Sequence, residues 1–463
     1  MSDDLLAGVA ARVAEYQSTL AGRPVPARAG AAELQAMLGG ELPSGPTDPG
    51  AAVTALVDAV DAGSVASAGP RYFGFVVGGA MPATIAADWL ASGVDINAGA
   101  YVLGPVAAVA EEVASTWLLE LLGLPGDASV GFTSGAMMAS FTGLAAARHH
   151  VLAKAGWDVE RDGLQGAPRV HVVVGAERHV TIDSALRLLG LGHGTVHVAA
   201  ADDQGRMQVP ALREVLAECD GPTIVCAQVG NVNSGASDPV GAVCDTAHEH
   251  GAWVHVDGAF GLWAAASPAL RAQVAGVERA DSWTTDAHKW LNVPYDSGLA
   301  IVAHPDAHRA PLRLPASYLA PAPGGHRDND EYVPESSRRA RGFAVWAALR
   351  TLGRSGVADL VDRCCAHARR FASQLSAIES VEVLNDVVLN QVVVRFGDSD
   401  EVTRRVIAAA QAEGTCWFGG TVWRGVAAAR ISVSNWSTTE ADVDASVAAI
   451  RSVLNSNVTR SGT

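Results

Sequence analysis

Apolar positions follow a helical period in the first third of the chain and a different pattern after residue 130. In residues 1–20, Leu5, Val9 and Val13 recur every four positions, and a Pro- and Gly-rich break follows. Residues 51–63, 84–92 and 106–122 predict further helices. From residue 130, short apolar runs alternate with helical segments. The predicted strands are a run from 130 and the segments 170–174, 195–198, 223–227, 253–256 and 299–302, and the predicted helices between them are 137–155, 181–189, 210–219 and 240–250.

Short buried strands that alternate with helices are typical of an α/β fold with a mostly parallel, doubly wound sheet covered on both faces. Ligands of such sheets bind beyond the carboxyl ends of the strands. Ser134, His179, Asn231, Asp257 and Lys289 all fall just after predicted strands or in turns. We therefore expect one crevice to collect these residues.

The pattern changes again after about residue 320. A Pro-, Gly- and charge-rich stretch leads to helices through 346–352 and at 358–377, strands near 380–385 and 390–396, a helix at 400–413, a strand at 429–434 and a helix at 439–454. This predicts a small C-terminal α+β domain. The predicted divisions are an N-terminal helical arm (1–50), a large α/β domain (51–320), a mobile loop and linker (321–341), the small domain (342–455) and a frayed tail (456–463).

Composition excludes several classes of function. The formal charge of −16 argues against a nucleic-acid surface and against binding to anionic membranes. Six cysteines show neither a CxxC pair nor metal-ligand spacing, which is typical of reduced thiols. The start of the chain has no basic secretory signal, and no apolar run approaches twenty residues. We expect a cytoplasmic protein that spans no membrane.

Only two lysines occur in the chain, Lys154 and Lys289, although arginines are numerous. Arginine stays protonated at any working pH, whereas a desolvated lysine can lose its proton and attack a carbonyl carbon. Lys154 ends a helical run and is interpreted as a surface residue. Lys289 follows His288 at the end of a strand-like segment, where a Schiff-base lysine is expected. A partly exposed structural lysine is the alternative for Lys289.

Three other positions suit the same chemistry, and each has an ordinary structural interpretation as well. The turn from Ser134 opens a helix after a strand, where backbone N–H groups and the helix dipole bind phosphate, or where a plain turn would suffice. Asp257 ends an apolar strand and needs a partner, which is either a protonated pyridine nitrogen, an arginine, or the next turn if the carboxylate caps it. His179 begins a helix and is suited either to stack on an aromatic ring or to cap the helix.

Taken in order along the chain, these motifs resemble the group II amino-acid decarboxylases, which are pyridoxal-phosphate enzymes of fold type I (aspartate aminotransferase-like). The resemblance covers roughly residues 65–455. Its most specific parts are His255-Val-Asp257-Gly-Ala259, Asp286-Ala-His288-Lys289-Trp290 and Ser337-Arg-Arg-Ala-Arg341. It implies a fold type I transferase architecture, pyridoxal 5'-phosphate as cofactor and a homodimer.

The resemblance also implies a role for each matching residue. Lys289 corresponds to the Schiff-base lysine, Asp257 to the partner of the pyridinium nitrogen and His179 to the residue that stacks on the ring. Tyr318 corresponds to the proton donor on a mobile loop. The other implied cofactor contacts are Ser134, Gly135, Ala136, Asn233, Ala259, Asp286 and His288.

The implied reaction is decarboxylation of an L-amino acid to the amine and CO2, with an aromatic amino acid as a candidate substrate. A carbon–carbon lyase and an aminotransferase are alternatives on the same fold, and Arg430 is a candidate carboxylate-binding residue by its resemblance to fold relatives. A non-catalytic cofactor-fold protein and a nucleotide-binding α/β protein are alternatives from other classes. Tyr72, Phe73 and Phe75 either line an aromatic pocket or belong to the core.

Four positions depart from the family pattern. The stretch near the cofactor that is Thr-rich in the family is Asn231-Val-Asn233 in this chain. Met137 stands where the phosphate turn usually has a serine, the segment before Tyr72 is Gly69-Pro70 in place of His-Pro, and Gly99 stands where aromatic-specific members tend to carry a bulky ring. These departures concern the substrate more than the cofactor.

Overall fold

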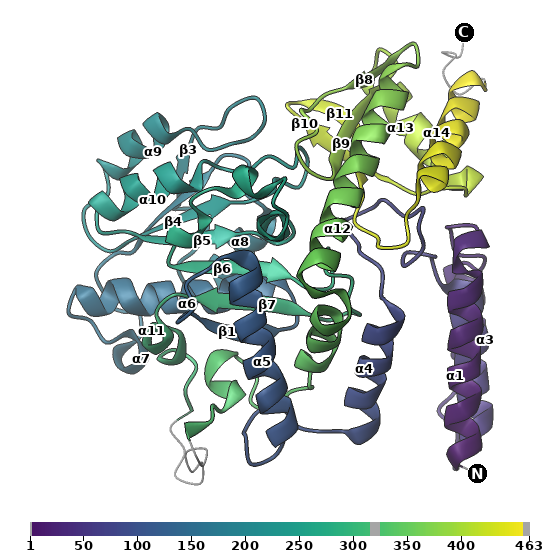
Figure 1. Ribbon diagram of the computed structural model, residues 1–463, viewed down its shortest axis with the longest axis horizontal. Helices are drawn as coiled ribbons and strands as arrows, with labels where there is room; N and C mark the ends of the chain where they lie inside the picture. The colour runs from purple at the N-terminus through teal and green to yellow at the C-terminus, as the bar shows by residue number, and fades with distance from the viewer. Residues whose placement is uncertain (1, 315–324, 457–463) are drawn as a thin grey trace.

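The large domain is built around a seven-stranded sheet. The computed structural model describes residues 2–314 and 325–456. The strands follow the order β1-β7-β6-β5-β4-β2-β3 (Figure 1). Their bounds are β1 Ser129–Thr133, β2 His171–Gly175, β3 His197–Ala199, β4 Thr223–Gln228, β5 Trp253–Asp257, β6 Ser282–Asp286 and β7 Gly298–Val302.

Strands β6, β5, β4, β2 and β3 run parallel, and β7 lies antiparallel between β1 and β6. The prediction of a mostly parallel sheet is therefore confirmed. Strand β6 has the polar sequence Ser-Trp-Thr-Thr-Asp, yet all five residues are buried. Its position between β5 and β7 gives its backbone groups partners on both sides.

Helices cover both faces of this sheet, because successive strand residues point to opposite sides. Val172 and Val174 of β2 pack in one apolar cluster with α6 (Ala136–Lys154) and α8 (Val180–Leu188). Val173 packs in the other cluster with α9 (Val209–Leu216), α10 (Val240–Glu249) and α5 (Pro105–Leu122). The remaining helices of this part are α4 (Pro82–Val94), α7 (Val159–Asp162) and α11 (Pro305–Arg309), with short 3-10 helices at Gly261–Ala266, Arg271–Val274, Val277–Arg279 and Asn329–Tyr332.

The C-terminal part forms the smaller α+β unit that the sequence predicts. Its antiparallel sheet has the order β10-β11-β9-β8. The bounds are α12 Gly342–Ser376, β8 Val381–Val383, β9 Gln391–Phe396, α13 Asp400–Glu413, β10 Gly419–Trp423, β11 Val426–Ser432 and α14 Glu440–Asn455. Helix α12 spans both predicted helices, and Gly353, with φ of 59°, interrupts its helical geometry between them. Strand β10 is an element that the sequence pattern did not predict.

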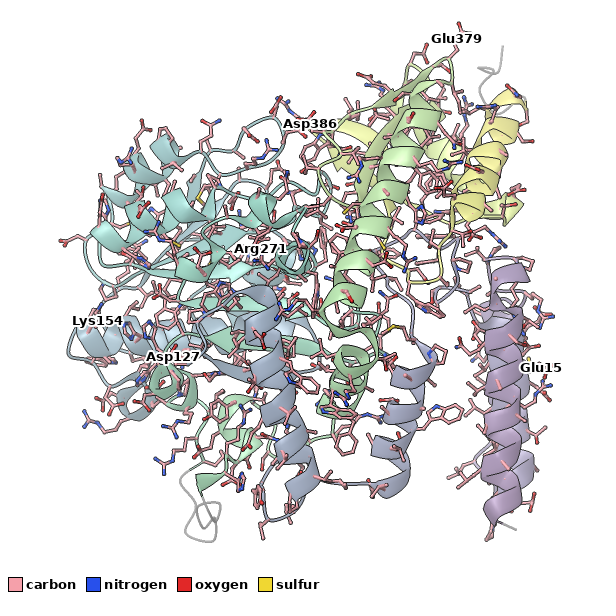
Figure 2. All side chains as sticks on the ribbon, viewed as in Figure 1. Glu15, Asp127, Lys154, Arg271, Glu379 and Asp386 are labelled. Atoms are coloured by element: carbon pink, nitrogen blue, oxygen red, sulfur yellow. The ribbon has the colours of Figure 1, made fainter. Side chains whose placement is uncertain are left out.

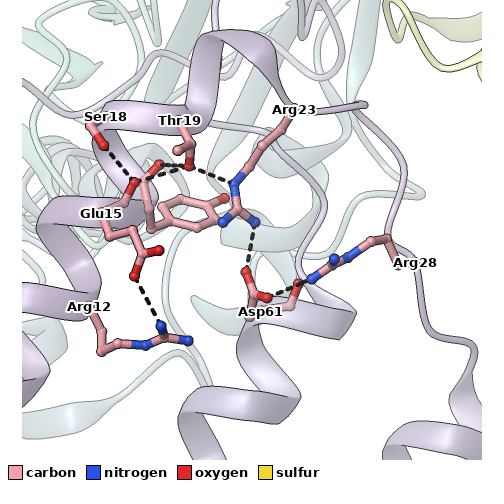
Figure 3. Close-up of polar contacts among 8 residues, drawn as sticks. Arg12, Glu15, Ser18, Thr19, Arg23, Arg28 and Asp61 are labelled. Atoms are coloured by element: carbon pink, nitrogen blue, oxygen red, sulfur yellow. Dashed lines mark hydrogen bonds and ion pairs between the residues drawn. The ribbon is translucent and has the colours of Figure 1, made fainter.

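The N-terminal helices α1 (Ser2–Thr19) and α3 (Pro49–Gly63) lie together beside the body of the protein (Figure 1). Between them are a 3-10 turn at Leu20–Gly22 and α2 (Ala31–Leu38). Asp61 connects α3 to the segment between α1 and α2, because its carboxylate accepts hydrogen bonds from Arg23 at 2.8 Å and from Arg28 at 2.6 Å (Figure 3). Arg23 also lies over the Tyr16 ring, 4.6 Å from its centroid. None of the described helices is long and apolar enough to cross a membrane.

Candidate active site

A cavity of about 400 Å³ opens at the carboxyl ends of β4, β5 and β6. The α6 N-terminus, β11 and the loop before α4 also contribute to its wall. Eight residues that the sequence singled out for cofactor binding line this cavity. They are Gly135, Ala136, His179, Asp257, Ala259, Asp286, His288 and Lys289.

Lys289 projects its amine into this cavity beside a buried carboxylate. Its Nζ lies 3.0 Å from Oδ2 of Asp286, whose side chain is 3% exposed. Oδ1 of Asp286 lies 3.5 Å from Nε2 of His288, and burial lowers the pKa of His288. The backbone N–H of Ser297 donates to Nδ1 of His288 at 3.1 Å, so this ring nitrogen is an acceptor. By contrast, Lys154 is exposed at the outer end of α6 (Figure 2).

Helix α6 directs its N-terminus at the same cavity. The backbone N–H of Ala136 donates to Oδ1 of Asp286 at 2.6 Å, which joins the start of the helix to the end of β6. The close approach depends on small residues. A Cβ added at Gly298 would meet the backbone of Gly135 at 2.4 Å, so β7 leaves no space for a side chain there. The free N–H groups and positive dipole of a helix N-terminus favour an anion such as phosphate.

Asp257 ends β5 and is 5% exposed. Its Oδ1 accepts a hydrogen bond from the Ala259 N–H at 3.2 Å, and within the described residues it forms no ion pair. His179 is the N-cap of α8, with Nδ1 2.8 Å from Oγ1 of Thr181. Burial lowers the pKa of His179, while the charge of Asp257 acts in the opposite direction. His179 therefore caps the helix, as one interpretation predicted, and it also lines the cavity, while its stacking on an aromatic ring stays a prediction.

Other sequence candidates lie beside the cavity or outside the described residues. Ser134 directly precedes the lining residue Gly135, but is not itself part of the lining. Asn233 accepts a hydrogen bond from Oγ1 of Thr421 in β10 at 2.9 Å. Asn231 is buried and donates to Glu177 O and to Gln228 Oε1. Tyr318 lies outside the residues that the structure describes.

Sequence reasoning did not single out several residues of the cavity wall, namely Val76, Thr181, Gln228, Gly230, Val232 and Phe260. Gln228 carried a usable signal, because it ends β4 as Asp257 ends β5. Val76 and Val232 have no chemical signature in the sequence. Arg430 of β11 also reaches the cavity, and burial lowers its pKa. Among the described residues, Arg430 forms no ion pair with a carboxylate.

Of the three aromatic candidates, Phe75 lines the wall of the cavity, whereas Tyr72 and Phe73 do not. Phe75 lines the cavity and is 64% exposed, and its ring lies 5.4 Å from that of Trp417. Tyr72 stacks on the same Trp417 at 4.9 Å and is not part of the cavity lining. Phe73 is 1% exposed and packs edge-on against Phe371 in the core. At Gly99, a Cβ would meet the Ser336 carbonyl oxygen at 2.2 Å, so this backbone has no space for a ring.

The match to known families agrees with this geometry. Residues 54–397 match the model of the pyridoxal-dependent decarboxylase conserved domain. The chain belongs to this family. Its cofactor is pyridoxal 5'-phosphate, and it is a carboxy-lyase that decarboxylates amino acids.

Among the relatives of this decarboxylase, the aromatic-L-amino-acid decarboxylase of Bacillus atrophaeus is 30% identical over 338 residues, which cover 72% of this chain and 68% of the relative. Tryptophan decarboxylase 1 of Oryza sativa subsp. japonica is 30% identical over 404 residues, covering 80% and 77%. The solved structure of Oryza sativa TDC with PLP and tryptamine superposes with a TM-score of 0.90 at 26% identity, covering 98% of each chain. The fold type I assignment is thereby confirmed.

The residues of the cavity fit the cofactor. The Lys289 amine suits the carbonyl group of the cofactor, and the α6 N-terminus suits its phosphate. Asp257 is a buried carboxylate without a cationic partner among the described residues, and a protonated pyridine nitrogen would provide one. Ala259 and His179 both line the cavity and are suited to contact a flat ring.

Proposed function

We propose that this decarboxylase holds pyridoxal 5'-phosphate through Lys289, Asp257 and the N-terminus of α6. The observation that carries the proposal is that an amine, a buried carboxylate and a helix N-terminus surround one cavity. The bound cofactor supplies an electron sink for the bond that breaks at Cα. Asp257 holds a proton on the ring nitrogen by its negative charge, which strengthens that electron sink. Lys289 anchors the cofactor, and His179 contacts its ring.

Arg430 is the proposed anchor for the carboxylate of the incoming amino acid. It is the cationic side chain of the cavity wall that has no carboxylate partner among the described residues. His179 has a pKa lowered by burial, so at neutral pH it is uncharged and does not compete with Arg430 for that carboxylate. Arg430 would therefore set the orientation of the substrate, and its replacement should raise KM more than it lowers kcat.

The proposed substrate class is the aromatic L-amino acids. The cavity wall carries Phe75, Val76, Met137 and Val232, which offer an apolar surface to a side chain larger than that of alanine. Two relatives named above act on aromatic amino acids by name, whereas a third, the L-2,4-diaminobutyrate decarboxylase of Rhizobium meliloti, is named for a cationic one. A panel of aromatic, acidic and diamino acids, assayed by CO2 release, separates these classes.

Tyr318 is proposed as the proton donor to Cα, on the family resemblance alone. Tyr318→Phe should lower amine formation and raise abortive transamination or oxygen-dependent by-products. Amine formation at the wild-type rate by this variant would exclude the assignment.

A homodimer is proposed from the exposed apolar side chains of α3, α4 and α5. Trp89 and Leu90 are 43% and 61% exposed on α4, and Val106 is 58% exposed at the start of α5. Exposed apolar patches of this kind favour a protein partner, and homo-oligomers mostly use closed two-fold symmetry. Light scattering should give twice the chain mass, Leu90→Glu should weaken association, and Leu188→Glu, at an exposed leucine of α8, is the matched control.

The cofactor assignment is tested by the visible absorbance of the purified protein, followed by borohydride reduction and peptide mapping. We expect a yellow protein whose reduced cofactor is attached to the peptide that contains Lys289. Since Lys154 is the only other lysine of the chain, Lys154→Arg is a matched control that should change nothing. A cofactor trapped elsewhere, or a protein that stays colourless with added pyridoxal phosphate, would refute the proposal.

A further inference from the structure

Two histidines and a cysteine meet at the end of the sheet that lies away from the active site. His171 is the first residue of β2, and His197 is the first residue of β3. Cys219 follows α9, which packs on both strands. One ligand atom of each residue lies within 4.8 Å of the other two. No other group of three potential metal ligands approaches this closely within the described ranges 2–314 and 325–456.

The distances suit a small tetrahedral ion. His171 Nδ1 lies 3.0 Å from His197 Nε2. Two nitrogens bound at roughly 2.0–2.1 Å to a tetrahedral zinc would lie about 3.3 Å apart, so the rings need only a small adjustment. The Cys219 sulfur would have to approach by about 1 Å, since Zn–S bonds are about 2.3 Å long. Cys219 is partly exposed beyond the end of its helix, and its sulfur would exchange its present hydrogen bond to the Val215 carbonyl oxygen, at 3.4 Å, for the ion.

The chemistry of the donors selects the metal. Imidazole nitrogens and a thiolate bind Zn2+ in preference to Mg2+ or Ca2+, which favour oxygen ligands.

We propose that His171, His197 and Cys219 form a Zn2+ site, with a fourth position left to water or another small ligand. The ion would connect β2, the edge strand β3 and the end of α9. His179, which lines the catalytic cavity, follows the opposite end of β2. Since five strand residues separate these ends by more than about 10 Å, the metal would stabilise the edge of the sheet and take no part in catalysis.

Thiol reactivity of the intact holoenzyme gives a direct test. Cys219 is partly exposed, whereas the other five cysteines are buried. An aromatic disulfide reagent should therefore modify one thiol rapidly in chelator-treated enzyme, and stoichiometric Zn2+ should protect it. Peptide mapping should identify this thiol as Cys219. A single rapidly modified thiol whose rate of modification does not change when Zn2+ is added would overturn the proposal.

Substitutions then test the ligand set by calorimetric Zn2+ titration. His197→Ala and Cys219→Ser should each weaken Zn2+ binding by about 100-fold or more, because even outer contacts of a metal site contribute roughly 10–100-fold. His193→Ala removes an exposed histidine of the same segment and should bind Zn2+ normally. Equal affinity in all three variants would overturn the proposal. If a variant fails to fold, the thiol-protection result on the unmodified enzyme decides, and Co2+ provides a second readout through the visible bands of tetrahedral coordination.

Discussion

Gly78→Ala should displace the backbone of Lys289 without removing any functional group. Gly78 is buried, and a Cβ added to it would lie 1.9 Å from the Lys289 carbonyl oxygen and 3.2 Å from that of His288. Non-bonded Cβ contacts below 3.0 Å are essentially never seen, so the Lys289 backbone has to move by about 1 Å. A displacement of about 1 Å at a catalytic group costs on the order of 10²-fold in rate.

We therefore expect Gly78→Ala to lower kcat by about 100-fold and to lower the free energy of unfolding by about 1–3 kcal/mol. The bound-cofactor absorbance band should weaken at a fixed cofactor concentration, which separates displacement of Lys289 from general unfolding. Gly93→Ala is the matched control, since a Cβ there meets nothing within 4 Å and Gly93 lies in helix α4. That control should be neutral or slightly stabilising. Wild-type kcat and cofactor affinity in Gly78→Ala would refute the inference that the close approach of Gly78 positions Lys289.

Three further predictions follow from buried charges and histidines. Asp257→Asn should lower kcat by about 10²-fold or more with little change in thermal unfolding, because it removes the negative charge that is proposed to hold a proton on the ring nitrogen of the cofactor. Unchanged steady-state kinetics would contradict this prediction. Glu111→Ala should cost about 3–5 kcal/mol in chemical denaturation, since it leaves Arg338, 2.8 Å away and fully buried, without its partner. A loss below about 1 kcal/mol would show that the pair is not essential. Burial lowers the pKa of His255 and of His308 to about 3, so the unfolded chain binds more protons than the folded one between about pH 6.5 and 3. Stability should fall as the pH falls through that window, by about 2 kcal/mol for each histidine at pH 5, and His308→Gln should reduce the slope of the unfolding free energy against pH.

The residues at the ends of strands were predictable because their signal is local. An apolar run that ends in a polar residue, as at Asp257, identifies both the strand and the edge of the sheet where its last side chain lies. Gln228 ends β4 in the same way and lines the cavity, but it was not predicted as a site residue. Its position was a usable signal, whereas a neutral amide does not by itself indicate a catalytic or cofactor-binding role.

Contacts across long stretches of sequence were not predictable from the local pattern of residues. Arg430 reaches the cavity from β11, about 140 residues after Lys289. Only the family resemblance pointed to Arg430, because the packing of the small domain determines its position. Strand β10 begins with two glycines, which have low strand propensity, and it forms because it pairs with β11. Its Thr421 then bonds Asn233, which the sequence had assigned to the cofactor.

Asn292 explains how the small domain and the lysine segment are held in one geometry. It lies three residues after Lys289, is completely buried and has φ of 57°, a conformation that asparagine tolerates better than most residues. Its Oδ1 accepts from the N–H groups of Gly79 at 2.7 Å and Trp436 at 3.0 Å, and its Nδ2 donates to Ser434 O at 2.9 Å. One side chain thus joins the loop before α4, the turn after Lys289 and the segment after β11. Because these bonds are buried and mutually satisfied, Arg430 and Lys289 line one cavity whose wall is held in place without a substrate.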